Sequence, residues 1–200
     1  MHWELMRSRA LERLAREIMN GAVDEEVLEL LDALNSTEKV FTTSSCAGRI
    51  TVLCSDAPPN DKVAARIMFK SHSPVSVREV KEAIENAQNC AYVWAKSSHP
   101  LLDLMVKELD LAWRLVDLAK RAGFKYSGVQ RSRDYYRVII RSNDNIQIPM
   151  DGDEDLKKLA KSVSALNKFL LDGKVKLARL ISLIDEEFVF GEELLERLLF

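Results

Sequence analysis

Apolar residues recur at helical spacing near both ends of the chain. In the N-terminal part they stand at Leu5, Leu11, Leu14 and Ile18, and then, beyond Asp24, at Val27, Leu28, Leu31 and Leu34. Apolar positions three and four residues apart form one face of an amphipathic helix. We therefore expect two helices within residues 1–37, the second with Asp24 as its N-terminal cap.

Shorter apolar runs of β-forming residues lie between residues 38 and 150. The predicted strands are 39–43, 49–55, 64–71, 90–95, 127–131, 135–141 and 145–149. Two helices interrupt them. One runs from Ser76 to Ala87 with Ser76 and Glu79 as a capping box, and the other runs from Leu101 to Ala122 and ends at Gly123. This order predicts an α+β fold with a mixed, largely antiparallel sheet and flanking helices.

An apolar residue recurs every seven positions in the last part of the chain, at Leu156, Val163, Leu170, Leu177 and Ile184. This spacing predicts a long helix that packs against the N-terminal helices or a second subunit, with Gly173 as a potential break point. The preceding acidic cluster of Asp151, Asp153, Glu154 and Asp155 lacks the spacing of a calcium loop and reads as a solvated helix start. We expect a single domain, 1–200, with N-terminal helices (1–37), an α+β catalytic core (38–150) and a C-terminal helical extension (151–200).

Composition narrows the classes of protein. Of the 200 residues, 47% are apolar and 30% are charged, and the net charge is −2, so a nucleic-acid interface has to be local. No signal peptide and no membrane span are expected. Three cysteines without paired spacing favour a reducing, cytoplasmic location over a disulfide framework, with Cys54 and Cys90 as core residues in strands.

Residues 41–50, FTTSSCAGRI, are the most informative stretch, and we call them the polar bend. Hydroxyls, a thiol, a glycine and an arginine lie here between two apolar runs. Ser44, Ser45 and Cys46, together with Gly48 and Arg49, offer donors and acceptors where the backbone can approach a ligand. A serine-rich hairpin loop is the alternative interpretation.

Two side chains could supply reactive chemistry. Cys46 would act as a nucleophile if a base such as His72 formed its thiolate, but a small apolar filler is the more common role of cysteine. His72 lies between a strand and a helix, where ligands often bind. The chain contains no phosphate loop, no HExxH motif, and no glycine-rich turn of a Rossmann methyltransferase.

Residues 120–141 form a basic segment. Seven cations oppose one acid, and four aromatic residues lie among them: Lys120, Arg121, Lys125, Arg131, Arg133, Arg137 and Arg141 against Asp134, with Phe124, Tyr126, Tyr135 and Tyr136. Cations neutralise phosphates and aromatic rings stack on unpaired bases, as recognition of an RNA loop requires. A solvated hairpin with surface ion pairs is the alternative.

The polar bend, with Asn35-Ser36 before it, resembles the signature of the tRNA wybutosine-synthesising protein 3 family. The resemblance continues in matching order at residues 70–75 (KSHSPV), 123–128 (GFKYSG) and 138–141 (VIIR), and it spans about residues 20–150. Family members often have serine where Ala47 stands here.

The resemblance implies an S-adenosylmethionine-dependent methyltransferase of archaeal type, acting on N4 of 7-(3-amino-3-carboxypropyl)-4-demethylwyosine at position 37 of tRNA-Phe. His72 is then the candidate general base, and Ser45 and Arg49 are further catalytic candidates. The residues expected at the cofactor or the modified base are Ser44, Cys46, Trp94, Gly123, Phe124, Ser127 and Gly128. Those expected to contact the anticodon stem-loop are Lys125, Arg131, Arg133 and Arg141. No metal is expected.

Two other functions remain open at this point: an RNA-binding module without catalysis, and a thiol-dependent enzyme that uses Cys46. The methyltransferase hypothesis requires the polar bend, the segment around His72 and the corner at Gly123–Gly128 to form one recess.

Overall fold

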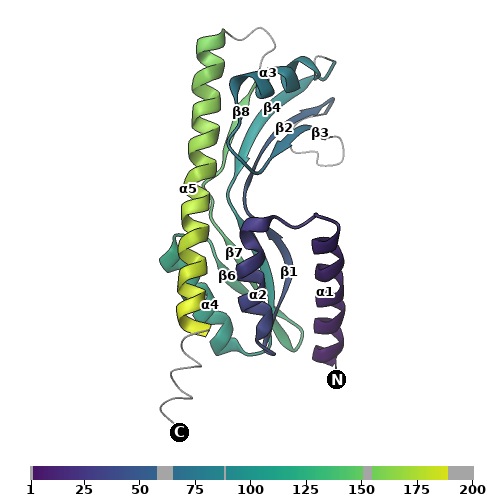
Figure 1. The fold of residues 1–200 in the computed structure, drawn as a ribbon, viewed down its shortest axis with the longest axis vertical. Helices are drawn as coiled ribbons and strands as arrows, with labels where there is room; N and C mark the ends of the chain where they lie inside the picture. The colour runs from purple at the N-terminus through teal and green to yellow at the C-terminus, as the bar shows by residue number, and fades with distance from the viewer. Residues whose placement is uncertain (1, 58–64, 88, 151–154, 189–200) are drawn as a thin grey trace. The chain divides into compact units, whose positions relative to one another are not determined.

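The computed structural model describes residues 2–57, 65–87, 89–150 and 155–188, in which helices lie at both ends of the chain and strands lie between them (Figure 1). The helices are α1 (His2–Met19), α2 (Leu28–Ser36), α3 (Val77–Glu85), α4 (Leu109–Ala122) and α5 (Leu156–Phe188), with a 3-10 turn, η1, at Glu25–Val27. The strands are β1 (Val40–Cys46), β2 (Arg49–Ser55), β3 (Arg66–Ser71), β4 (Tyr92–Ser98), β5 (Leu101–Val106), β6 (Gly128–Ser132), β7 (Tyr135–Arg141) and β8 (Ile146–Pro149). The α+β class and all seven predicted strands are confirmed, with small shifts at their ends.

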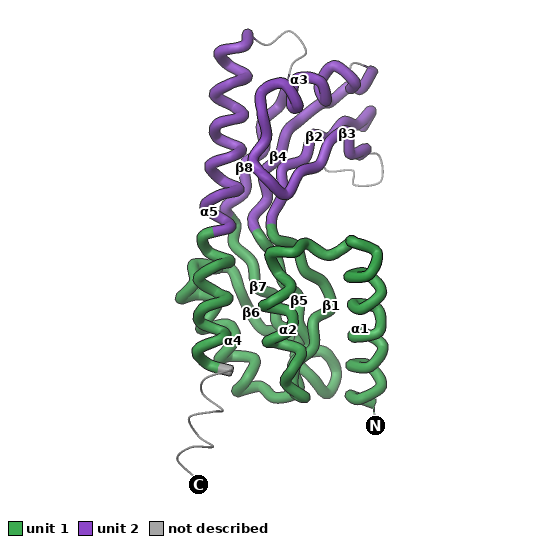
Figure 2. Tube along the Cα trace, in the orientation of Figure 1, with its two compact units in different colours: residues 1–47, 100–143, 175–200 green, residues 48–99, 144–174 purple. Residues whose placement is uncertain are grey.

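The chain divides into two compact units, shown in different colours in Figure 2. Unit 1 consists of Met1–Ala47, Pro100–Asn143 and Val175–Phe200, and unit 2 consists of Gly48–His99 and Asp144–Lys174. Each unit combines segments that are distant in the sequence. The division therefore does not follow the boundaries at 38 and 150 that the sequence suggests.

Unit 1 contains a four-stranded antiparallel sheet in the order β1-β5-β7-β6, which we call sheet A. One face of sheet A carries the buried core. Its strands contribute residues such as Leu104 and Ile140, and α2, α4 and the end of α5 contribute residues such as Leu30, Leu115 and Leu180. On the other side, Trp3 of α1 packs its ring against Phe41 and Tyr135, with centroids 4.9 Å apart in both pairs.

Unit 2 contains a second four-stranded antiparallel sheet, β3-β2-β4-β8, which we call sheet B. Ile50 and Val52 of β2 pack in its core with Val80 of α3 and with Val163 and Leu166 of α5. Pro149 lies on β8, an edge strand, where a residue without an N–H is tolerated.

The predicted helix from Leu101 to Ala122 is wrong in its first part, because Leu101–Val106 form β5 in the middle of sheet A. The apolar spacing of Leu101, Met105 and Leu109 suits a helix, but five of the six strand residues are apolar, as in a strand buried within a sheet. The helix α4 starts only at Leu109. Its predicted end is confirmed, since Gly123 is the C-cap with φ 107°.

The long C-terminal helix is confirmed, and it continues through Gly173. Its apolar seam packs into the two cores: Leu159, Val163, Leu166 and Leu170 belong to the core of unit 2, and Leu177, Leu180 and Ile184 to the core of unit 1. Asp151, Asp153 and Glu154 lie outside the described residues. The carbonyl of Asp155 accepts the first hydrogen bonds of the helix, and none of the described helices is long and apolar enough to cross a membrane.

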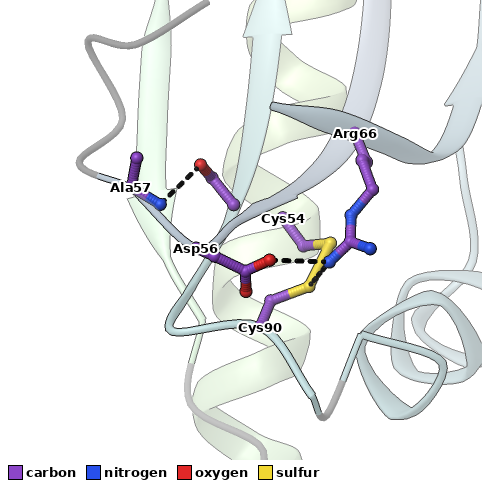
Figure 3. Close-up of a disulfide and its surroundings, with 6 residues drawn as sticks. Cys54, Asp56, Ala57, Arg66 and Cys90 are labelled. Atoms are coloured by element: carbon purple, nitrogen blue, oxygen red, sulfur yellow. Dashed lines mark hydrogen bonds and ion pairs between the residues drawn. A yellow bond between two sulfur atoms is a disulfide. The ribbon is translucent and has the colours of Figure 1, made fainter. Parts of the chain in front are cut away.

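Cys54 and Cys90 form a disulfide, contrary to the expectation of unpaired cysteines (Figure 3). Cys54 pairs with Val93 in the register of β2 and β4, and Cys90 lies just before β4 rather than inside a strand. The sheet therefore brings together two residues 36 positions apart, which their spacing does not reveal. Arg66 donates to the carboxylate of Asp56 at 3.3 Å and to Sγ of Cys90 at 3.1 Å.

The capping box at the start of α3 is confirmed. The Ser76 hydroxyl accepts from the backbone N–H of Glu79 at 3.2 Å, and the Glu79 carboxylate accepts from the backbone N–H of Ser76 at 2.7 Å. The hydrogen bonds that the Glu79 carboxylate accepts, from the Ser76 backbone N–H and from the Ser76 hydroxyl at 2.7 Å, lower the pKa of Glu79. The stability that they add is therefore present at neutral pH and is lost as the pH falls through that lowered pKa.

We expect Ser76→Ala to lower the free energy of unfolding by about 1 kcal/mol, because a helix N-terminal N–H loses its acceptor. Urea unfolding followed by circular dichroism measures this change. Ser164→Ala, at an exposed position within α5, is the control and should leave stability nearly unchanged or raise it slightly. Equal effects of the two substitutions would show that the capping box contributes nothing.

Candidate functional site

The polar bend begins on an irregular part of β1. Pairing with β5 shifts by one residue between Thr42 and Ser44, so Thr43 is the extra residue of a β-bulge. The Thr43 hydroxyl donates to the carbonyl of Asp103 at 2.9 Å, and the Thr43 carbonyl accepts from Nη2 of Arg13 at 2.5 Å. These two hydrogen bonds stabilise the bulge through the side chain and the backbone of Thr43.

This bulge decides which polar side chains point to which face of sheet A. After it, Ser45 pairs with Leu102, a core residue, whereas Ser44 pairs with Asp103 on the opposite face. A strand without the bulge would place these side chains the other way round, because side chains alternate along a strand. Bulges are frequent beside active sites, where they redirect a side chain.

A pocket of about 230 Å³ lies in unit 1 beside the bulge. Ser44 and Ser45, both predicted site residues, line it. The other lining residues come from α1, from the segment after it and from β1: Ala10, Arg13, Leu14, Glu17, Ala22, Val23, Thr42 and Thr43. The hydroxyls of Ser44 and Ser45 make no hydrogen bond to any residue that the structure describes, so they can serve a ligand.

The Asp24 side chain stabilises the end of the polar bend and does not cap a helix. Its side chain makes no capping hydrogen bond, which corrects the sequence-based prediction. Its carboxylate instead accepts from the backbone N–H of Ala47 at 2.7 Å. Gly48 follows with φ 89°, a backbone conformation that favours glycine and that turns the chain toward β2.

His72 follows directly after β3 in unit 2, and its Nδ1 lies 2.9 Å from the carbonyl oxygen of Gly48. A carbonyl oxygen accepts only, so Nδ1 carries the hydrogen in this contact. In the neutral ring the lone pair then belongs to Nε2. The backbone of the polar bend thus orients the imidazole as a general base requires.

The segment that carries His72 is fixed by Asn167 of α5, a residue that the sequence analysis did not single out. The amide of Asn167 accepts from the N–H of Val75 and donates to the carbonyl of Val75, both at 2.8 Å. The Ser71 hydroxyl donates to the carbonyl of Ser73 at 2.8 Å. In the sequence, Asn167 is marked only by its polar amide, which stands next to Leu166 of the apolar seam.

Arg49, the first residue of β2, is exposed. Its guanidinium makes no hydrogen bond or ion pair with the part of the chain that the structure describes. An arginine in this state can bind a carboxylate or phosphate through two parallel hydrogen bonds. Arg49 therefore suits the role predicted for it.

The corner at Gly123–Gly128 is built mainly from buried groups. Phe124 has an exposed fraction of 0% in the core of unit 1. Ser127 is 7% exposed, and its hydroxyl donates to the Phe124 carbonyl at 2.7 Å and accepts from the Arg141 N–H at 3.2 Å. The Ser127 hydroxyl thus joins the corner to β7. The burial of Phe124 and Ser127 favours a structural role, and the ligand contact that the sequence suggested stays a prediction.

Three other predicted site residues, one buried and two partly exposed, lie in β4, β1 and β6. Trp94 is 7% exposed in β4, where it pairs with Leu53 and Pro149, so packing accounts for it. Cys46, at the end of β1, takes no part in the disulfide and is partly exposed. Gly128 opens β6 with no atom near the position that a Cβ would take, so no close approach requires a glycine there.

The basic segment does not form one uniform stripe. Arg137 binds the carboxylate of Asp103 through Nε, at 2.8 and 2.9 Å from the two oxygens, and through Nη2. This contact raises the pKa of Arg137. Nε of Arg131 donates to the carbonyl of Arg133, the residue with φ 56° in the hairpin between β6 and β7.

Lys125, Arg133 and Arg141 are exposed, and their charged groups make no hydrogen bond or ion pair within the described residues. In sheet A, Cys46 pairs with Leu101 and Leu101 pairs with Arg141, so all three point to the same face. Strands lie about 4.8 Å apart, which places Cys46 and Arg141 about 10 Å from each other. Sheet A thus brings Cys46 of the polar bend and Arg141 of the basic segment together on one face.

The predicted site residues are shared between the units. Ser44, Ser45, Cys46 and the corner belong to unit 1, whereas Arg49, His72 and Trp94 belong to unit 2. The single recess that the hypothesis requires stays a prediction.

Comparison with known proteins gives one consistent result. Residues 6–199 match the family described as Methyltransferase TYW3. A protein of Thermococcus sibiricus, named tRNA(Phe) 7-((3-amino-3-carboxypropyl)-4-demethylwyosine(37)-N(4))-methyltransferase, is 35% identical over 185 residues, which cover 90% of this chain and 92% of that protein. A Pyrococcus furiosus protein of the same name, numbered 1, is 36% identical over 197 residues, with 92% and 95% covered.

The chain is also similar to solved structures. The PH1069 protein of Pyrococcus horikoshii has a TM-score of 0.84 at 36% identity and covers 90% of this chain and 95% of its own. A hypothetical protein of Aeropyrum pernix has a TM-score of 0.69 at 28% identity, with 82% and 98% covered.

Proposed function

Because the chain belongs to the TYW3 methyltransferase family, we propose that it methylates N4 of 7-(3-amino-3-carboxypropyl)-4-demethylwyosine at position 37 of tRNA(Phe), with S-adenosylmethionine as the methyl donor. The observation that carries this proposal is the match of nearly the whole chain to a methyltransferase family and to relatives that bear this name. The chain uses a sheet arrangement unlike the Rossmann fold of common methyltransferases.

The described residues fit ligands that carry carboxylates and phosphates. In unit 2 the uncommitted guanidinium of Arg49 suits a carboxylate, and in unit 1 the hydroxyls of Ser44 and Ser45 suit a polar ligand group. When bound, S-adenosylmethionine supplies a methyl group on a sulfonium, which an electron pair on the ring nitrogen displaces in line. Such a displacement needs alignment of the reactants more than covalent help from the protein.

His72 has the geometry of the base in this reaction. Its Nδ1–H is held by the Gly48 carbonyl, so Nε2 accepts the proton that leaves the ring nitrogen as the new N–C bond forms. Asn167 keeps the His72 segment in place through Val75. Arg49 binds a carboxylate of one reactant, and Ser45 is a hydrogen-bond partner for a ligand group.

The substrate tRNA is proposed to bind where the exposed cations lie. Lys125, Arg131, Arg133 and Arg141 approach the phosphates of the anticodon stem-loop, whereas Arg137 is committed to Asp103. We propose that the protein acts in the cytoplasm, and the disulfide then points to a thermophilic source, because cytoplasmic disulfides are common in hyperthermophiles and rare in other organisms.

Arg141→Ala is expected to weaken tRNA binding and to lower the slope of log affinity against log salt by about 0.7 to 0.9, the value for one lost phosphate contact. Fluorescence anisotropy with labelled tRNA(Phe) at several salt concentrations measures the slope. The control Lys81→Ala removes an exposed cation that pairs with Glu85 on α3, and should leave the slope unchanged. An unchanged slope for Arg141→Ala would remove this residue from the interface.

Two measurements test the proposal as a whole. Calorimetric titration with S-adenosylmethionine should show binding, which an RNA-binding module without catalysis would not. Mass analysis of tRNA(Phe) that carries the demethylated base should show one added methyl group after incubation with the protein and S-adenosylmethionine. A protein that binds the tRNA but gives neither signal would refute the assignment.

A further inference from the structure

The pocket beside the bulge combines two opposite charges with a row of hydroxyls. Arg13 and Glu17 lie one turn apart on α1, and Nε of Arg13 is 3.6 Å from Oε1 of Glu17. Both side chains are about half exposed, and both line the pocket. Ser44 and Ser45 line the strand side of the pocket, and apolar residues such as Leu14 complete the lining.

The guanidinium of Arg13 is held in position, but among the residues that the structure describes only some of its N–H groups have a partner. Its Nη2 donates to the carbonyl of Thr43, the bulge residue, and its Nε faces Glu17. A guanidinium has five N–H donors in a planar fork, so donors remain for a ligand. Because the bulge carbonyl anchors it, this side chain loses less freedom on binding than a free surface arginine.

The charges of the pocket discriminate between kinds of ligand. Arg13 and Glu17 sum to zero, and the Glu17 carboxylate would repel a phosphate, which carries only negative charge. A group that carries a carboxylate and an ammonium together matches the pair, with the carboxylate at Arg13 and the ammonium at Glu17. The volume of about 230 Å³ is below the roughly 300 to 1,000 Å³ of sites for whole drug-sized ligands, so the pocket suits one end of a larger molecule.

We propose that this pocket binds the zwitterionic α-amino acid end of a reactant, with Arg13, Glu17, Ser44 and Ser45 as its ligand-binding residues. The inference rests on the proposed function, because both reactants named there carry such a group at the end of a short carbon chain. S-adenosylmethionine ends in it, and the aminocarboxypropyl side chain of the modified base ends in it as well. None of the four residues is assigned a role in proton transfer by this inference.

The experiment compares Arg13→Gln and Glu17→Gln with wild type and with the control Arg16→Gln. Arg16 lies on the same helix, outside the pocket lining, and loses the same charge. Calorimetry measures the affinity for S-adenosylmethionine and for 5′-methylthioadenosine, which lacks the amino acid end. Methyl-transfer kinetics are measured with tRNA that carries the base with its aminocarboxypropyl side chain, and with tRNA whose base lacks it.

Two results support the proposal and identify the source of the amino acid end. If the cofactor occupies the pocket, each pocket variant weakens S-adenosylmethionine binding about 10- to 100-fold, as expected for a lost charge-assisted hydrogen bond, and leaves 5′-methylthioadenosine binding unchanged. If the modified base occupies it, cofactor affinity stays at the wild-type value. In that case kcat/KM falls by a similar factor for the tRNA with the side chain, and not for the tRNA without it.

Other results overturn the inference. Pocket variants that behave like Arg16→Gln refute it while leaving the proposed function intact, provided the wild type methylates tRNA. The inference is also refuted if a pocket variant weakens S-adenosylmethionine and 5′-methylthioadenosine equally, or lowers kcat/KM equally for the two tRNA substrates. Such a result indicates a general structural effect. Glu17→Gln keeps the contact of Arg13 with Thr43, so it tests the pocket even where Arg13→Gln lowers stability. A wild type that neither binds S-adenosylmethionine nor methylates tRNA overturns both proposals.

Discussion

His72→Gln is expected to lower kcat by at least about 100-fold, the usual lower bound for the loss of a general base. The glutamine amide can still donate to the carbonyl of Gly48, which Nδ1 contacts at 2.9 Å, so the local hydrogen bond is retained. It offers no basic nitrogen for the proton of the substrate. Single-turnover methyl transfer, with both ligands saturating, measures the chemical step directly.

Binding affinities distinguish the loss of a catalytic base from a disruption of the fold. The affinities for S-adenosylmethionine and for tRNA should stay close to wild type in His72→Gln, because the base acts mainly in the transition state. The matched control is His2→Gln, which makes the same change at an exposed histidine beside Tyr135. A His72→Gln enzyme that reacts as fast as the control would exclude this histidine as the base.

Arg49→Ala is expected to weaken the binding of one carboxylate-bearing reactant about 10- to 100-fold, since charge-assisted hydrogen bonds contribute about 1.5–3 kcal/mol each. Within the described residues no protein group uses this guanidinium, so its loss should not disturb the fold. Calorimetry with S-adenosylmethionine and KM for the modified tRNA show which reactant is affected. Thermal unfolding should match that of the wild type.

Arg49→Lys separates charge from geometry. Lysine keeps the charge but cannot form two parallel hydrogen bonds, so it should restore only part of the lost affinity. Arg78→Ala, which removes an exposed arginine paired with Glu82 on α3, is the control and should bind like wild type. If Arg49→Ala also binds like wild type, the predicted carboxylate contact does not exist.

Cys46→Ser distinguishes displacement from thiol chemistry. Under the proposed mechanism the substitution should reduce activity only modestly, because the thiol forms no bond to the substrate. A loss as large as that of His72→Gln would instead favour a covalent intermediate at Cys46. The same single-turnover assay gives this comparison.

Most helices and strands could be predicted from the sequence because their apolar residues recur at the spacing of a helix or a strand. β5 was the exception. Leu101, Met105 and Leu109 fit a helical face, and the single polar residue of the strand, Asp103, is tolerated inside sheet A because Arg137 binds its carboxylate. That partner lies 34 residues away, so local spacing could not reveal it.

The sequence suggests the residue types of the candidate site but not its geometry. Ser44, Ser45 and His72 were proposed from composition and family resemblance, and their roles stay predictions. The bulge at Thr43, which decides where the serines point, depends on the register of a partner strand. Arg13 and Glu17 resemble an ordinary surface ion pair on a helix until the fold places β1 beside them. Phe124 and Ser127 come from the same family resemblance, and their burial shows that they help to build a corner of unit 1, while their predicted ligand contact stays a prediction.

The way each unit gathers its strands and helices has a consequence for synthesis on the ribosome. The core of unit 1 contains Val27 near one end of the chain and Ile184 near the other. Sheet A is complete only after β7 has been made, and by then α2 and α4 are present to cover its core face. The share of that core that Leu177, Leu180 and Ile184 contribute is made later, so the nascent protein finishes burying unit 1 only with the end of α5.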